Sequence, residues 1–174
     1  DLRRHAFAVA AADGGPDVGR VLLQQLTESG NQRLRQDTAY GLAHLRDQEL
    51  IAELRQQILD GAVGSSELWF YLYWSLSVEG YQPAWQWLQE NFASLSSQLS
   101  MRDRSRAGLE LARHLCTQQE ADQLEQMLQP YIADTFGSER NLQAGLENIG
   151  LCQAFVEASR SSAQGFFELN RSSL

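Results

Sequence analysis

The residues best suited to binding a metal or transferring a proton are the three histidines, His5, His44 and His114. A catalytic zinc site on a helix typically needs two histidines four residues apart in an H-E-x-x-H motif, so that both imidazoles reach one ion. None of these histidines is followed by Glu, and no two share that spacing. We therefore predict no metal site in this chain, and we expect each histidine to be partly buried or close to a helix end.

Thiol chemistry would have to come from Cys116 and Cys152. The sequence contains no C-x-x-C motif and no cluster of Cys with His, which excludes structural zinc sites and thioredoxin-like chemistry. Apolar residues make up 43% of the 174 residues, which is enough for a core without a covalent link. We expect two buried free thiols, with a disulfide as the alternative.

The charged residues exclude several classes of function. Asp and Glu number 22 against 14 cations, the net charge is −8, and every cation is Arg. Without lysine there is no Schiff-base chemistry and no phosphate-binding lysine of a P-loop or kinase. The acidic balance argues against binding a nucleic-acid backbone. The motifs G-x-S-x-G and G-x-G-x-x-G are absent as well, so we predict no catalytic residue in this chain.

The elements that would position these residues are helices. Apolar residues recur at helical spacing along nearly the whole chain, and Gly, Pro, Ser and Asn separate the periodic runs. The pattern predicts helices over 2–12, 17–29, 31–45, 48–60, 66–79, 83–98, 101–115, 118–134 and 139–159, with a further one over 162–169. Short loops between about nine or ten helices predict an all-α fold of antiparallel hairpins, stacked as a HEAT/armadillo-like α-superhelix in a single unit over 1–174.

Local signals refine this outline. Thr117 and Glu120 have the spacing of a capping box at a helix start, and Pro83 fits the first turn of a helix. Pro130 should kink its helix or end it early. The stretch 68–74, Leu-Trp-Phe-Tyr-Leu-Tyr-Trp, is apolar on every face, which indicates a central core helix; an aromatic substrate pocket is the alternative. The sequence contains no run of about 18 apolar residues, so it predicts no membrane span.

One segment resembles a known family. Residues 83–95, PAWQWLQENFASL, are similar to the "AW-x-[WF]-L-x-x-N-[WF]-x-x-L" segment in the C-terminal helical domain of zinc aminopeptidases. That family includes aminopeptidase N, the puromycin-sensitive enzyme and the antigen-trimming enzymes of the endoplasmic reticulum. Upstream, residues 35–50 resemble the family's "ALA…d-x-x-L" helix pair, and 111–122 and 137–149 resemble its later helices. The resemblance covers about residues 31–160.

The resemblance implies that this chain is the later part of that helical domain, cut from a longer polypeptide whose upstream catalytic domain holds zinc. The abrupt start at Asp1, without an initiator Met, agrees with this expectation but leaves the compartment open. The family's H-E-x-x-H and G-x-M-E-N motifs are absent, and Gly145-Leu146-Glu147-Asn148 only superficially resembles the latter. By analogy, the domain forms a concave bowl that encloses the active site and admits short peptides, whose N-terminal residues the parent enzyme removes.

Arginines are the best candidates for contacting a peptide, because a guanidinium fork suits a C-terminal carboxylate. Arg113 and Arg140 lie in segments that resemble the family, so we name them as candidate peptide contacts. Solvated or ion-paired arginines are the alternative at both positions. A free-standing HEAT-like module that binds a peptide or protein segment is the alternative function.

Overall fold

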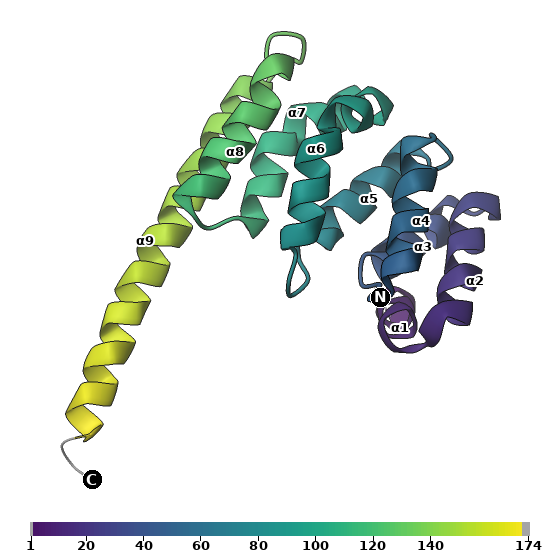
Figure 1. Ribbon diagram of the computed structural model, residues 1–174. Helices are drawn as coiled ribbons and strands as arrows, with labels where there is room; N and C mark the ends of the chain where they lie inside the picture. Colours follow the sequence, from purple (N-terminus) through teal and green to yellow (C-terminus); the bar gives the residue numbers. More distant parts are fainter. Residues whose placement is uncertain (1, 172–174) are drawn as a thin grey trace. The chain divides into compact units, whose positions relative to one another are not determined.

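The computed structural model describes the backbone of residues 2–171 and the side chains of residues 2–160 and 163. All regular elements in this range are helical (Figure 1): α1 Leu2–Asp13, α2 Gly15–Glu28, α3 Gln32–Leu42, α4 Gln48–Leu59, α5 Ser65–Ser75, α6 Gln82–Gln98, α7 Met101–Leu111, η1 Ala112–His114, α8 Gln118–Leu128, η2 Gln129–Tyr131 and α9 Ser138–Arg171. The predicted all-α class is confirmed. Within the described range, no helix has both the length and the apolar character needed to cross a membrane.

The chain divides into two compact units, Asp1–Arg104 and Ser105–Leu174. In the first unit, α3 contacts both α1 and α5, while α4 contacts both α2 and α6. Each helix therefore packs against the next but one, which gives two layers and is the pairing of a stacked α-superhelix. That one domain spans 1–174 stays a prediction.

The core of the first unit is made mainly of leucines that recur at helical spacing. Its largest fully buried side chains, each less than 2% exposed, are Leu42, Leu50, Leu54, Ile58, Leu68, Leu72, Leu88 and Leu95. Helix α5 lies between α3 and α6 in the contact order and buries Leu68, Trp69, Tyr71 and Leu72. The expected core role of the aromatic helix is therefore confirmed. Trp85 is buried whereas Trp87 is only half-buried, as their spacing of two residues requires.

The second unit is built around α9, which packs against α8 and η1. Glycines on α7 and α9 let these helices cross closely: a Cβ on Gly108 would lie 2.6 Å from Cα of Leu142, and one on Gly145 would overlap the carbonyl oxygen of Gly108. This close approach accounts for Gly145 in physical terms, because only a residue without a side chain fits there.

Two boundaries in this unit test the sequence prediction. Helix α8 ends at Leu128, and Pro130 lies in the 3₁₀ turn η2 that follows, so the predicted early end is confirmed. The predicted break between 159 and 162 is wrong, because α9 continues to Arg171. The residues there, Arg160-Ser161-Ser162-Ala163, include neither Gly nor Pro, and Ser has only a modest cost within a helix. Figure 1 shows the later part of α9 extending beyond α8.

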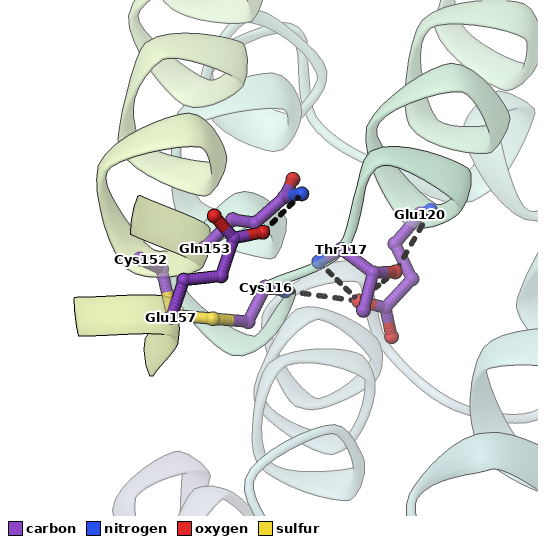
Figure 2. Close-up of a disulfide and its surroundings, with 6 residues drawn as sticks. All are labelled: Cys116, Thr117, Glu120, Cys152, Gln153 and Glu157. Atoms are coloured by element: carbon purple, nitrogen blue, oxygen red, sulfur yellow. Dashed lines mark hydrogen bonds between the residues drawn. A yellow bond between two sulfur atoms is a disulfide. The ribbon is translucent and has the colours of Figure 1, made fainter. Parts of the chain in front are cut away.

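The expectation of free thiols is also wrong, because Cys116 and Cys152 form a disulfide with Cα atoms 5.2 Å apart. Cys116 follows η1 and precedes the helix cap of α8, whereas Cys152 lies on α9. Figure 2 shows the bond beside the predicted capping box, in which Glu120 Oε2 accepts the backbone N–H groups of Cys116 at 2.9 Å and Thr117 at 3.0 Å. The Thr117 side chain in turn accepts the Glu120 N–H, which confirms the box. This cap fixes the loop so that Cys116 faces α9.

Candidate functional site

Both arginines named from the sequence lie in the second unit with accessible guanidinium groups. Arg113 is in η1, its side chain is 55% exposed, and its Nε lies 3.4 Å from Glu110 Oε2. Arg140 is exposed in the first turn of α9. Within the part of the chain whose side chains are described, the structure does not bring the two arginines together, and Arg113 fits the alternative of a surface ion pair. Peptide contact at either residue stays a prediction.

The histidines do not gather around a metal site. Among the described residues, no group of three His, Cys, Asp or Glu side chains is placed to hold an ion. His5 and His44 instead contact the same ring, that of Tyr40, with centroid distances of 5.6 and 4.9 Å. His114 lies in the other unit, where burial and then Arg113 lower its pKa below the ordinary 6.5.

A strongly charged cluster in the first unit surrounds a carboxylate that sequence reasoning did not single out. Asp37 on α3 is completely buried, and Arg3 of α1 donates to its Oδ2 from Nε at 2.8 Å and also from Nη2. Arg4 Nε and Arg33 Nε each lie 3.7 Å from the other oxygen, Oδ1. Arg33 and Asp37 are four residues apart on α3, a spacing that could have signalled this pair but not the contribution of α1.

A second buried carboxylate repeats the arrangement one helix further. Glu67 of α5 is 2% exposed, and its Oε1 accepts a hydrogen bond from Arg35 Nε of α3 at 3.1 Å. Arg35 also donates to the backbone oxygen of Ser29. Ion pairs thus join α1 to α3 and α3 to α5, along one layer of the unit. Since buried carboxylates are costly unless paired, these contacts fix how the three helices stack.

A pair of packed aromatic side chains, Tyr40 and Trp74, adjoins the Asp37 cluster. The guanidinium carbon of Arg4 lies 5.4 Å from the centroid of the Tyr40 ring, and Tyr40 packs edge-on against Trp74 at 4.9 Å. Tyr40 is buried, whereas Arg4 and Trp74 are half-buried. Guanidinium groups beside aromatic faces are a surface typical of ligand recognition, because they offer both charge and flat contact area.

A further pocket of about 250 Å³ lies between the helix ends of the first unit. Its lining includes Arg55 of α4 and Tyr71 of α5, and the Arg55 guanidinium carbon lies 5.0 Å from the Trp87 ring centroid. Burial raises the pKa of Tyr71, while the neighbouring Arg55 acts in the opposite direction. Tyr71 is therefore a neutral hydrogen-bonding group at neutral pH and does not act as a base.

Comparison with known protein families agrees with the resemblance found in the sequence. The family model of the ERAP1-like C-terminal domain matches residues 1–151. None of the curated proteins matches the sequence closely enough to serve as a named relative. The matched region agrees with the resemblance found over 31–160, and it adds α1 and α2, where no motif signalled the family.

Proposed function

Because the chain belongs to the ERAP1-like C-terminal domain family, we propose that it is the non-catalytic helical domain of a zinc metalloaminopeptidase. In this proposal it encloses the active site of an upstream catalytic domain and helps to admit peptide substrates. The observation that carries the proposal is the family match over residues 1–151. Zinc would be held by the catalytic domain, where it would polarise the scissile carbonyl and activate water.

Arg113 and Arg140 remain the proposed peptide contacts of the second unit. Each has an exposed guanidinium group, which can form two parallel hydrogen bonds to a carboxylate. Neither is buried in the core, so both can be changed without opening a cavity. This accessibility supports their use as probes of substrate admission.

Charge reversal in the full-length enzyme tests the proposal. Arg113→Glu and Arg140→Glu are expected to raise KM for peptides several-fold, while kcat and KM for a small aminoacyl anilide stay unchanged. Arg20→Glu is the matched control, because Arg20 is a 59% exposed arginine that also forms a surface ion pair, with Asp17. Unchanged peptide KM values in both test variants would refute their role as contacts.

Two further measurements separate the possible roles of the chain. The isolated chain should fold as a helical protein, bind no stoichiometric zinc and cleave no aminoacyl anilide; measurable cleavage would refute a non-catalytic domain. The upstream part of the same polypeptide should contain an H-E-x-x-H helix. Its absence would favour the free-standing HEAT-like interaction module.

We also propose that the protein resides in an oxidising compartment. The disulfide between Cys116 and Cys152 supports this, because such bonds persist in secreted, luminal and periplasmic proteins and are rare where glutathione keeps thiols reduced. Protein extracted from its native cells should resist alkylation until it is reduced. Alkylation of both cysteines without reduction would place it in a reducing compartment.

A further inference from the structure

Helix α9 continues well past its packed part. Among the side chains that are described on this helix, Ile149 is the last buried one, at 1% exposed, and Cys152 is tied to Cys116 by the disulfide. The side chains over 154–160 are all exposed. Figure 1 shows this later part of α9 beyond α8. The disulfide therefore anchors a helix whose next turns present their side chains to solvent.

One face of these exposed turns is apolar. Its four exposed residues stand at positions i, i+3, i+4 and i+7, which share one face of an α-helix: Leu151, Ala154, Phe155 and Ala158. Leu151 is 69% exposed and Phe155 is 73% exposed. Large apolar side chains that lie singly on a surface are ordinary, but a contiguous apolar patch marks an interaction site. We call these four residues the α9 strip.

Acidic residues border one side of the strip. Glu147 and Gly150 line a groove of about 280 Å³ between α8 and α9, together with Asp122 and Glu125 of α8. Glu157 is seven residues after Gly150, so it lies on the same side of α9 as the groove. The groove is lined by three carboxylates and by no arginine. This side of the strip therefore carries negative charge from both helices.

The opposite side of the strip is uncharged, because Asn148, Cys152 and Ser159 lie along it. A matching partner is apolar in the middle and cationic only on the side that faces the groove. An amphipathic helix with Lys or Arg along one edge has this pattern. An anionic membrane surface would be repelled by the carboxylates, and a second copy of the chain would bring its own net charge of −8.

We propose that the α9 strip and its acidic side form a docking site for a cationic amphipathic helix of another protein or peptide. This interaction goes beyond the proposed function and does not depend on it. The strip begins beside Cys152, so the disulfide fixes its first turn before the partner binds and lowers the entropy cost of binding. Apolar contact supplies the affinity, while the carboxylates orient the partner and speed its encounter.

Three fluorescent peptides of about 18 residues, or five helical turns, test the site by anisotropy with the 174-residue chain. The first has a Leu and Ala face with Arg along one edge. The second has the same face with Glu in place of Arg, and the third has the composition of the first in scrambled order. The first should bind at least about tenfold more tightly than either of the others, because it alone matches both the strip and its charge.

Phe155→Ser and Leu151→Ser test the apolar contact. Both side chains are largely exposed in the free chain, so the substitutions should leave its circular dichroism and its urea unfolding unchanged. Each should weaken binding of the cationic peptide about tenfold or more, since an apolar side chain no longer becomes buried. Val21→Ser is the matched control, because Val21 is 63% exposed on α2 in the other unit. It should leave binding unchanged.

The double variant Glu147→Gln with Glu157→Gln tests the charged side. It should reduce the preference for the cationic over the acidic peptide several-fold and make binding less sensitive to salt. Binding that keeps both its preference and its salt dependence would remove these carboxylates from the site and overturn the proposed orientation of the partner.

Four results would overturn the proposal. Equal binding of the ordered and scrambled cationic peptides would show that charge alone attracts them. Unchanged binding by both Phe155→Ser and Leu151→Ser would place the contact elsewhere. A dimer of the chain alone in sedimentation, dissociated by Phe155→Ser, would assign the strip to a second copy. Finally, a full-length polypeptide that does not bind the cationic peptide would show that its own domains cover the strip.

Discussion

The close crossing between α7 and α9 makes a sharp prediction about two glycines on one helix. Gly145 faces Gly108, whose carbonyl oxygen a Cβ would overlap, and a Cβ at Gly145 would also lie 3.0 Å from that of Ala112. Gly150 is five residues further along α9, and apart from its own helix it has no atom within 4 Å of the place where a Cβ would lie. The substitutions Gly145→Ala and Gly150→Ala should therefore change stability in opposite directions.

The magnitude follows from two terms. Replacing Gly with Ala inside a helix gains about 0.8–1 kcal/mol of helix propensity, and this gain is common to both sites. Forcing a methyl group into a packed contact costs about 1–3 kcal/mol, and a backbone oxygen cannot rotate away as a flexible side chain can. Gly150→Ala should thus raise the free energy of unfolding by up to about 1 kcal/mol. The free energy of unfolding of Gly145→Ala should be lower than that of Gly150→Ala by about 2 kcal/mol or more.

Urea and thermal unfolding monitored by circular dichroism measure both variants. For a chain of this length, about 2 kcal/mol corresponds to a difference in Tm of about 4–8 °C. Gly108→Ala provides a second test of the same contact from the other helix, because its Cβ would lie 2.6 Å from Cα of Leu142. All three substitutions lie in the second unit, so its unfolding transition is the one to compare.

The reasoning would be refuted if Gly145→Ala were as stable as Gly150→Ala. That result would mean that α7 and α9 can separate without cost, and that the close approach does not contribute to stability. Destabilisation by Gly150→Ala would refute the other half, because no atom outside its own helix lies within 4 Å of the place where the added methyl group would sit.

Three further predictions concern the loop before α8. Changing Cys116 and Cys152 to Ala should cost about 4 kcal/mol by loop entropy for a separation of 36 residues, and reducing agent should destabilise only the unmodified chain. Thr117→Ala should cost about 1 kcal/mol in urea unfolding, since it removes a helix cap, whereas Thr117→Ser should be nearly neutral. Burial lowers the pKa of His114, so the unfolded chain binds protons more readily: stability is retained above pH 6.5 and falls below it. His114→Gln should reduce that fall in unfolding curves measured at successive pH values.

Features encoded by neighbouring residues could be predicted from the sequence. The capping box needs only Thr117 and Glu120, three residues apart, and the early end of α8 needs only Pro130. The burial of the aromatic helix also follows from local composition, because a helix that is apolar on every face must be enclosed. In each case the determining interaction lies within about one helical turn or one helix.

Features that depend on packing between distant segments could not be predicted. The disulfide requires α9 to bring Cys152 to the end of η1, and its two residues are 36 apart. The carboxylate of Asp37 is held by Arg3, which is 34 residues away and on another helix. The predicted break after residue 159 was wrong for a different reason. Serines are tolerated inside a helix, so they do not end α9.

The use of arginine as the sole cation suits the way the first unit is joined. Arg3 reaches from α1 to Asp37 on α3, and Arg35 reaches from α3 to Glu67 on α5, so each pair links next-but-one helices. Both carboxylates are almost fully buried, where a strongly hydrated ammonium group would lose more solvation than a guanidinium group and could not form the same planar fork. The composition that excludes amine chemistry is therefore compatible with two buried ion pairs that join next-but-one helices in one layer of the first unit.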